Sequence, residues 1–402
     1  MEIGIGIIGV GNIGSYLYNE INKKKSEIYR NLGFKIKIVG VSVKNRKKKR
    51  LVRIDKKLFF KNPKDLAKNN NVHILFELIG MSDGISKTVV ETALRNKKHV
   101  ITANKALISK HGEYLSTLAE KNNVNLEFEA SVGGGIPVLR TIKDGLATNK
   151  ISKVVGILNG TSNYILTEME KTKKSFNDVL SKSQKLGLAE ANPKFDLDGS
   201  DVLSKVKILS SLAFKKKISL EKCLKDGIEN IELKDIEMAN NLNLRIKLLG
   251  ITEIINNSLF ERVHASLVPK DNYIANINGS MNAVILNGKP VGESVLQGEG
   301  AGPGPTSSAL MSDLLSILRG NIKYPFGIPN KKKDKIKSYN KDFYENSLYL
   351  RLEVKDKPGV LSDLTKILAK HRISIERLIQ IPDKKKRKAT IVFITHKCLE
   401  KK

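Results

Sequence analysis

Apolar and polar positions alternate in regular blocks along the first 130 residues. An apolar run ends in glycines, and Ile13, Leu17 and Ile21 then form one stripe at helical spacing. A second helix is predicted at residues 86–96. Buried strands are predicted at residues 3–10, 34–43, 73–79 and 99–102. Strands that alternate with helices of this size indicate an α/β fold with a Rossmann-type, doubly wound parallel sheet, which we place at residues 1–130.

The pattern changes beyond about Glu129. A glycine cluster closed by Pro137 leads into long apolar-periodic stretches that run to about Gly320. They predict a second domain of α+β type at residues 131–322, whose end packs back on the first domain. Residues 323–346 are basic, poor in apolar side chains and interrupted by prolines, which is the composition of a linker.

A third unit follows the linker, at residues 347–402. Apolar residues alternate with other residues from Leu348 to Val354, which predicts a strand. A DKPG turn, a helical pattern and two further strand-like runs, at residues 373–381 and 389–395, complete this segment.

Length and composition narrow the class of protein. The chain has 402 residues with 40% hydrophobic content, which corresponds to roughly two to four domains. It contains no run of about 18 apolar residues and its start lacks a signal peptide, so we expect a cytoplasmic protein that enters no membrane. Cys223 and Cys398 are too few for a disulfide framework or a zinc site.

The net charge of +30 raises nucleic-acid binding as a hypothesis. The lysines are spread along almost the whole chain, and aromatic residues seldom lie among them as stacking platforms. The chain also lacks a zinc-finger spacing, an RNA-recognition signature and bZIP heptads. The distribution therefore favours a lysine-rich surface with no nucleic-acid partner.

The loop after the first strand has the pattern G-x-G-x-x-G. Gly9 allows a tight turn, Gly11 lets the backbone approach a pyrophosphate, and Gly14 lets the helix pack on the strand. The phosphates then lie at the positive end of the helix dipole. We therefore predict a dinucleotide site formed by Gly9, Val10, Gly11, Asn12, Ile13 and Gly14.

The end of the second strand selects the dinucleotide. NAD enzymes usually place an acid there for the ribose 2′-hydroxyl, but VSVKNRKKKR is followed by no acid before Asp55. Lys44 and Arg46 stand where the 2′-phosphate of NADP would lie. We therefore favour NADP over NAD, with ordinary surface lysines as the alternative.

The segment from Leu186 to Leu209 is rich in candidate chemistry. It contains four carboxylates, followed by a lysine: Glu190, Asp196, Asp198, Asp201 and then Lys205. Asp201 and Lys205 are four residues apart, so on a helix they share one face. A solvated surface ion pair is one alternative. The other is a lysine that passes a proton beside carboxylates, as hydride transfer to a carbonyl requires.

Four further segments place polar residues in or near glycine-rich turns, namely TANKAL, EASVGGGIPV, GILNGTSNYIL and GEGAGPGPTSSA. TANKAL puts Lys105 just after a strand, at the carboxyl edge where open α/β sheets bind ligands. EASVGGGIPV bends the backbone sharply and leaves carbonyls to face a cation or ligand. Each segment alone is compatible with a plain turn, but together with residues 186–209 they make five such segments, which are not well explained as turns.

With these segments in this order, the chain closely resembles the homoserine dehydrogenase family. The matching motifs are GVGNIG, TANKAL, EASVGGGIPV, GILNGTSNYIL, LGLAEANPKFDLDGSDVLSK, IKLLGI and GEGAGPGPTSSA. The resemblance covers about residues 1–320. It implies NAD(P)H-dependent reduction of L-aspartate 4-semialdehyde to L-homoserine, in threonine, methionine and isoleucine biosynthesis. It also implies a monofunctional enzyme whose middle domain is both the catalytic and the dimerisation domain of a dimer or tetramer.

The resemblance implies a role for each residue of the reaction centre. Lys205 would be the proton donor, and Lys105 a second lysine that contacts cofactor or substrate. Glu190 and Asp201 would hold the amino and hydroxyl ends of the substrate, and Asp196 would orient that group.

Two further sites follow from the same resemblance. Gly187 and Gly302 would line the cofactor site. A structural monovalent cation, sodium or potassium, would be held by the side chain or backbone of Glu129. Its other ligands would be the carbonyls of Val132, Gly134 and Ile136.

The last segment resembles an ACT regulatory domain, a ferredoxin-like βαββαβ fold, through LYLRLEVKDKPGVLSDL and the helix and strands after it. The chain ends at Lys402 after the third strand, so we expect a partial ACT domain without the last helix and strand. Inhibition by threonine, which the domain implies in relatives, is therefore expected to be weak.

Two alternatives stay open. One is another NAD(P)-dependent oxidoreductase of amino-acid metabolism. An aspartate-semialdehyde dehydrogenase would need a nucleophilic cysteine, and neither Cys223 nor Cys398 fits that role. The other alternative is a basic nucleic-acid-binding protein, which salt-titrated binding would distinguish from an enzyme.

Overall fold

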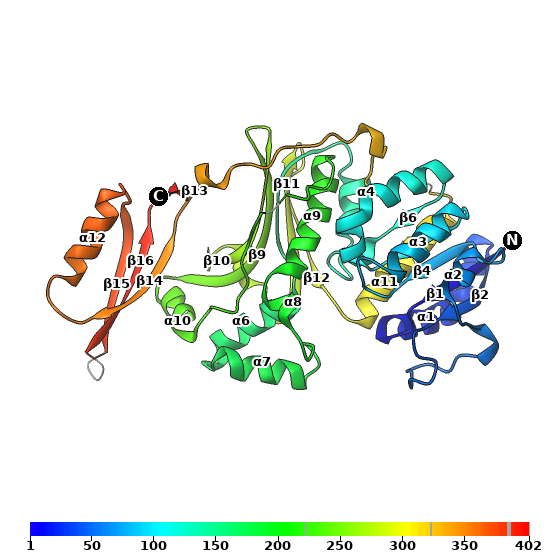
Figure 1. The fold of residues 1–402 in the computed structure, drawn as a ribbon, viewed down its shortest axis with the longest axis horizontal. Coiled ribbons are helices and arrows are strands. Elements are labelled where there is room, and N and C mark those ends of the chain that lie inside the picture. The colour runs from blue at the N-terminus through cyan, green and yellow to red at the C-terminus, as the bar shows by residue number, and fades with distance from the viewer. Residues whose placement is uncertain (222, 322–323, 384–386, 402) are drawn as a thin grey trace.

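The computed structural model describes residues 1–221, 223–321, 324–383 and 387–401. The predicted boundary between second domain and linker, at residues 322 and 323, lies outside these ranges, as does Lys402. Three large sheets follow one another along the long axis of the molecule, with the N-terminus near one end (Figure 1). Within the described ranges, no helix combines the length and the apolar character needed to cross a membrane.

The first sheet has six parallel strands in the order β3-β2-β1-β4-β5-β6. The strands are β1 (Glu2–Ile8), β2 (Lys35–Ser42), β3 (Phe59–Phe60), β4 (Ile74–Glu77), β5 (His99–Thr102) and β6 (Leu126–Glu127). All side chains of β4 are buried, as expected for a parallel strand covered on both faces. The predicted Rossmann-type sheet is confirmed, and its order reverses beside β1, where such folds bind ligands.

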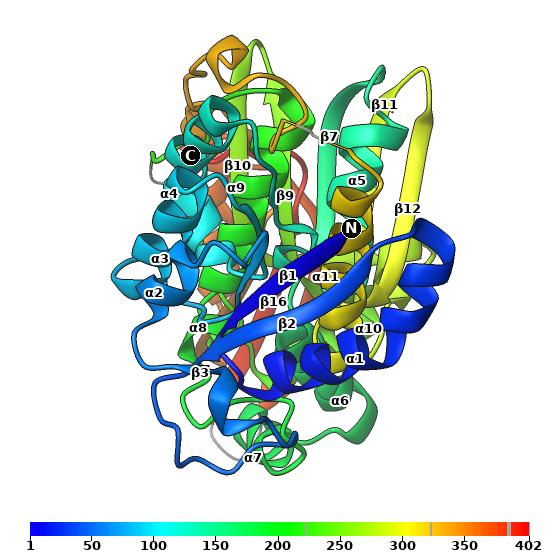
Figure 2. The same cartoon turned by 90° about the vertical axis from the view of Figure 1, so that its right-hand side faces the viewer.

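Helices cover both faces of the first sheet. They are α1 (Asn12–Leu32), α2 (Pro63–Lys68), α3 (Ile85–Arg95), α4 (Lys105–Asn122) and α11 (Pro303–Leu318). Helix α11 comes from much later in the chain, yet its Leu310 and Leu314 share a buried core with Leu17 and Ile21 of α1 (Figure 2). The first sheet is therefore covered by two separate pieces of chain.

The second sheet is mixed, with the order β12-β11-β7-β9-β10-β8. Its strands are β7 (Lys150–Ile157), β8 (Leu224–Lys225), β9 (Leu244–Ile255), β10 (Ser258–Pro269), β11 (Met281–Lys289) and β12 (Gly292–Glu299). The helices of this part are α5 (Val138–Arg140), α6 (Gly160–Thr172), α7 (Phe176–Lys185), α8 (Lys194–Leu197), α9 (Ser200–Phe214) and α10 (Leu233–Asn241). Helix α9 packs closely on one face, since a Cβ on Gly250 would lie 2.6 Å from the Val206 side chain.

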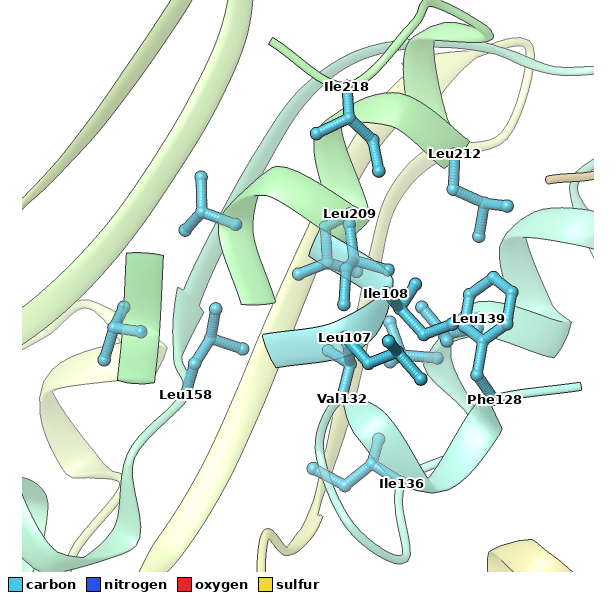
Figure 3. Packing of buried hydrophobic residues seen from close by; sticks show 14 of the residues in the cluster. Leu107, Ile108, Phe128, Val132, Ile136, Leu139, Leu158, Leu209, Leu212 and Ile218 are labelled. Atoms are coloured by element: carbon cyan, nitrogen blue, oxygen red, sulfur yellow. The ribbon is translucent and has the colours of Figure 1, made fainter. Parts of the chain in front are cut away.

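One buried cluster joins the first sheet to the second. Leu107 and Ile108 of α4 lie in this cluster beside Leu209 of α9 (Figure 3). Leu212, one turn further along α9, belongs to it as well. Because α4 and α9 pack on each other, the polar residues at their amino-terminal ends are brought close together.

The segment predicted as a linker is held to the rest of the molecule by contacts along its length. Phe326 is buried, with its ring centroid 5.2 Å from that of Phe128. The Asn330 side-chain amide donates to the Glu113 carbonyl, and Lys333 Nζ lies 2.7 Å from the Glu113 carboxylate. Further along, Asp334 and Ser338 form isolated β-bridges with Lys216 and Leu259, and the Tyr344 ring stacks on that of Phe260 with the ring centroids 4.2 Å apart. These contacts depend on distant parts of the chain, so the composition of the segment did not reveal them.

The third large sheet is antiparallel, in the order β14-β16-β15. Its elements are β14 (Tyr349–Lys355), α12 (Val360–Lys370), β15 (Ile375–Asp383) and β16 (Lys388–Thr395), with the short pair β13 (Glu345–Asn346) and β17 (Cys398–Leu399) beside them. This order of strands and helix is the one predicted. Asp235 of α10 holds the sheet, because its carboxylate accepts from the Tyr349 hydroxyl (2.9 Å) and from Arg351 Nε (2.7 Å).

Candidate active site

The loop between β1 and α1 has a backbone that requires glycine. Gly9 has φ of 96°, and a Cβ on it would lie 2.6 Å from the Leu78 carbonyl oxygen. A Cβ on Gly14 would lie 2.2 Å from the carbonyl oxygen of Gly9. At Gly11, by contrast, no described atom comes within 4 Å of the Cβ position. Gly11 therefore leaves space that the protein does not fill, as expected where a pyrophosphate approaches the backbone.

The end of β2 carries basic side chains next to this loop. The Gly9 N–H donates to the Ser42 carbonyl (2.9 Å), which fixes the loop to the strand end. Lys44 and Arg46 are both exposed. The Arg46 guanidinium donates to the Phe59 carbonyl (3.1 Å) and lies 5.9 Å from the centroid of the Phe59 ring. Arg46 is thus held against Phe59 of β3, with the exposed Lys44 two residues before it.

A buried polar network fixes the first turn of α4. Asn104 caps the helix, since its Oδ1 accepts from the Leu107 N–H (3.0 Å) while its own N–H donates to Thr102 Oγ1 (3.0 Å). The Thr102 hydroxyl donates in turn to the Glu77 carboxylate at the end of β4 (2.7 Å). Lys105 is the first residue of α4. Its side chain therefore starts at the carboxyl edge of the first sheet, where such sheets bind ligands.

Asp201 and Lys205 contact each other one turn apart on α9. Asp201 Oδ2 lies 2.7 Å from Lys205 Nζ, and Asp201 Oδ1 lies 3.0 Å from Lys105 Nζ. The Lys205 ammonium also donates to the Leu158 carbonyl. The side chains of Asp201 and Lys205 are 3% and 8% exposed, whereas that of Lys105 is 36% exposed. The pair is therefore buried, which excludes the alternative of a solvated surface ion pair.

Asn159, at the start of α6, bridges two carboxylates of the centre. Its Nδ2 donates to Asp196 Oδ1 and to Asp201 Oδ2, both at 2.9 Å. Its Oδ1 accepts from the Ser162 N–H (2.8 Å), which caps α6. Because both ends of the Asn159 amide are bonded, this residue links the start of α6 to both carboxylates.

Burial and charge together set the protonation states of the centre. Burial lowers the pKa of Lys205, and although Asp201 opposes this effect, the charge of Lys105 adds to it. Burial alone would also lower the pKa of Lys105, but Asp201 and the other nearby carboxylates raise it above its ordinary value. The pKa of Asp201 is held well below its usual range despite burial, because two ammonium groups face it. The pKa of Asp196 is raised by burial and by the charge of Asp201.

Three predicted ligand residues lie outside this contact group. Glu190 is exposed on the loop before α8, near enough for its charge to act on Lys105. Gly187 is exposed on the same loop, with φ of 73°. Gly302, with φ of 109°, directly precedes α11. The structure thus brings Lys105, Asp196, Asp201 and Lys205 together and leaves Glu190 and Gly187 at the solvent-exposed side.

The Glu129 side chain, which comes shortly before the glycine-rich loop, is bound by backbone groups of α5. Its two carboxylate oxygens accept from the N–H groups of Leu139 (2.9 Å) and Arg140 (2.7 Å). The Ile136 carbonyl accepts from the Val138 N–H (2.8 Å). Within the described ranges, no three His, Cys, Asp or Glu residues are grouped so that they could hold a metal ion. A cation at this loop would therefore depend on backbone carbonyls.

Comparisons with known proteins agree with this geometry. Residues 9–129 match the model of the homoserine dehydrogenase NAD-binding domain, residues 137–315 match that of homoserine dehydrogenase, and residues 348–401 match the ACT domain. A homoserine dehydrogenase from Neisseria gonorrhoeae is 38% identical over 405 residues, which cover 99% of this chain and 93% of that protein. One from Pseudomonas aeruginosa is 35% identical, with 100% and 93% covered. The chain belongs to the homoserine dehydrogenase family.

Solved structures of homoserine dehydrogenases have the same fold. That of Thiobacillus denitrificans has a TM-score of 0.91 and 36% identity, and the match covers 100% of this chain and 93% of that one. That of Staphylococcus aureus at pH 7.5 has a TM-score of 0.77 and 30% identity, covering 98% and 94%. The chain is thus an NAD(P)-dependent oxidoreductase of this family, which uses a nicotinamide cofactor and carries an ACT domain. The family, fold class and enzyme class predicted from the motifs are confirmed.

Sequence patterns missed three residues of the centre. Asn159 and Asn104 lie inside recognised motifs, and an asparagine directly before a helix is an N-cap signal that could have identified both. Glu77 gives no such signal, because it stands within the apolar run of residues 73–79. Its role arises only when β4 pairs with β5 and sets it opposite Thr102.

Proposed function

We propose that this member of the homoserine dehydrogenase family interconverts L-aspartate 4-semialdehyde and L-homoserine at the centre formed by Lys105, Asp201 and Lys205. The observation that carries the proposal is the buried contact of Lys205 Nζ with Asp201 Oδ2 at 2.7 Å, with Lys105 3.0 Å from the other oxygen. A lysine held between a carboxylate and a carbonyl, next to the dinucleotide sheet, is well placed to exchange a proton with a substrate oxygen.

In the reducing direction, NAD(P)H would, when bound, supply the hydride that the aldehyde carbon of the substrate accepts. Lys205 donates its proton to the carbonyl oxygen as negative charge develops there, so the product is a neutral alcohol. Burial supports this role because it lowers the pKa of Lys205 and makes the proton easier to lose. In the oxidising direction, neutral Lys205 accepts the hydroxyl proton instead.

The other charged groups are proposed to hold the substrate. Lys105 keeps its charge because nearby carboxylates outweigh the effect of burial on its pKa, and it would stabilise negative charge on the reacting oxygen. Glu190 and Asp201 would hold the amino and hydroxyl ends. Asp196 would orient the same group, supported by its hydrogen bond from Asn159.

We propose NADP as the preferred cofactor, with NAD as the alternative. The support is the pair Lys44 and Arg46 at the end of β2, with no acid in the residues that follow before Asp55. The pyrophosphate would be held by Gly9, Val10, Gly11, Asn12, Ile13 and Gly14, while Gly187, Gly302 and Lys105 would line the rest of the site.

A structural monovalent cation, sodium or potassium, is proposed at the loop before α5. The Glu129 carboxylate accepts from two backbone N–H groups and its backbone carbonyl accepts from the Val132 N–H (3.3 Å), and the free lone pairs of either group could bind the cation. The other ligands would be the carbonyls of Val132, Gly134 and Ile136. Such a cation would fix the loop that connects the two catalytic parts of the chain.

We propose that the enzyme is a homo-oligomer, a dimer or tetramer, built through the second sheet. Val155 of β7 pairs with Ile251 of β9 on the face opposite α9, and both remain half-buried in the single chain. A partner sheet would cover them. Light scattering tests this, and Ile251→Glu is expected to shift the molar mass towards that of one chain.

We also propose a cytoplasmic location. Its support is that Cys223 and Cys398 are both free thiols. Unpaired cysteines are usual in a reducing compartment.

The experiment that tests the activity is an absorbance assay at the NADPH band with aspartate semialdehyde. Oxidation of NADPH in the presence of this aldehyde, and not with succinate semialdehyde, would support the proposal. An enzyme that oxidises neither NADPH nor NADH with aspartate semialdehyde would overturn the proposed reaction. A ratio of kcat/KM for NADPH over NADH below one would overturn only the cofactor preference.

A further inference from the structure

Lys247 of β9 is a buried lysine that pairs with no carboxylate in the part of the chain that the structure describes. It lies in the IKLLGI motif and is 2% exposed. Its ammonium donates to three neutral oxygens, those of the Asn163 side chain (3.1 Å), the Ile277 carbonyl and the Asn278 side chain (3.4 Å). Arg245 and Glu170, the charged groups that act on it, pair with each other at 3.0 Å. Since burying a charge without a counter-ion is costly, this position calls for a physical reason.

Asn163 connects this ammonium to the first turn of α6. Its backbone N–H donates to the Asn159 carbonyl (3.2 Å). Its side-chain Nδ2 donates to the carbonyls of Ile277 (3.0 Å) and Met281 (3.1 Å), on the chain that enters β11. Because Lys247 bonds the Oδ1 of the same amide, both ends of the Asn163 side chain are fixed. The start of α6 is thereby tied to β9 and to β11.

We infer that Lys247 is a positioning residue of the reaction centre, which fixes α6 so that the Asn159 amide stays directed at Asp196 and Asp201. The inference rests on the proposed roles of these two carboxylates in holding the substrate. Lys247 touches neither of them. It acts through Asn163 and Asn159, whose Nδ2 lies 2.9 Å from each carboxylate.

An ammonium suits this position because it has three donors and no acceptor, and three oxygens surround it. Glutamine would supply two donors there, and methionine none. The pKa of Lys247 is lowered to about 8, chiefly by burial. The charge of Arg245 lowers this pKa further, whereas the charge of Glu170 raises it. A neutral amine would turn its lone pair towards one of the oxygens, so the contact is weakest above that pH.

The test compares Lys247→Met and Lys247→Gln with the matched control Lys98→Met. Lys98 is also a buried lysine, 5% exposed, that donates to a carbonyl, that of Val72 (2.7 Å), but it lies at the opposite, amino-terminal edge of the first sheet. Kinetic constants are normalised to active sites, which are counted by the fluorescence of bound NADPH.

We expect Lys247→Met to lower kcat/KM for homoserine about tenfold to a hundredfold, because small misplacement of reacting groups has effects of this size. Its KM for homoserine should rise while its KM for NADP stays within about twofold of wild type. The kinetic constants of Lys247→Gln should lie between those of Lys247→Met and those of wild type. Lys98→Met should leave the KM for homoserine unchanged.

Wild-type kinetics in Lys247→Met would overturn the inference, as would a parallel rise of the KM for homoserine and for NADP. If Lys247→Met does not fold, Lys247→Gln is judged by the same two criteria. If the wild-type enzyme shows no turnover of homoserine, both the proposed function and the inference are wrong. If the wild-type enzyme is active and Lys247→Met has the same kinetic constants, only the inference is wrong.

Discussion

The ammonium of Lys205 lies 2.7 Å from the carboxylate of Asp201, one helical turn earlier on α9. The other oxygen of Asp201 meets Lys105 at 3.0 Å, so one carboxylate serves two lysines of different exposure. The more deeply buried lysine has the lowered pKa and the more exposed one the raised pKa. This difference is the basis for assigning proton transfer to Lys205 and charge stabilisation to Lys105.

Replacing Lys205 by alanine is expected to lower kcat by about two or more orders of magnitude, the usual size of general acid–base catalysis. NADPH binding, measured by fluorescence, should change little. Lys207→Ala is the control, since Lys207 lies on the same helix and pairs with Glu261 at 2.6 Å. A Lys205→Ala enzyme with near-normal kcat would remove Lys205 from the proposed role.

The two reaction directions should depend on pH with opposite sign. As the pH rises through the pKa of Lys205, its proton is lost, so kcat/KM should fall for reduction and rise for oxidation. Because burial lowers this pKa, both changes should occur below the pH at which a free lysine titrates. Initial rates from pH 6 to about 10.5 would show this, and profiles that rise or fall together would contradict it.

Asn159→Ala removes the amide that bonds both Asp196 and Asp201. Hydrogen bonds to charged groups contribute about 1.5–3 kcal/mol, so kcat/KM for homoserine is expected to fall roughly tenfold to a hundredfold. Ser175→Ala is the matched control, because Ser175 caps α7 and contacts neither carboxylate. If the two variants lost activity equally, helix capping alone would explain the result.

The double substitution of Lys44 and Arg46 by glutamate should change the cofactor preference. The new carboxylates repel a 2′-phosphate, so KM for NADP is expected to rise about tenfold or more while KM for NAD changes little. Lys49→Glu adds negative charge to the same exposed loop and is the control. An unchanged NADP-to-NAD ratio would show that these side chains do not contact the phosphate.

Local patterns predicted most elements of the first sheet but not all of their limits. Strand β5 begins and ends at the predicted residues, His99 and Thr102. Strand β4 is shorter than the apolar run of residues 73–79 because the Glu77 carboxylate accepts the Ile79 N–H (2.9 Å) and turns the chain away. A turn made by a side chain within an apolar run leaves no mark on its hydrophobic pattern.

In the candidate site, too, local sequence patterns predicted some contacts and missed others. The pairing of Asp201 with Lys205 follows from a spacing of four on a helix, which the sequence contains. The contact of Lys105 with Asp201 does not, because it depends on how α4 packs against α9. Asn159 and Lys247 reach the centre through contacts between distant parts of the chain, which no local pattern records.

Helix α11 also affects how this enzyme can be recombined with its relatives. A dinucleotide-binding half cut out near residue 130 would lose Leu310 and Leu314 and leave Leu17 and Ile21 of α1 uncovered. A chimaera designed to exchange cofactor preference therefore needs two grafts, with residues 303–318 transferred together with the amino-terminal half. A single crossover should give an aggregating protein, whereas the double graft should remain folded.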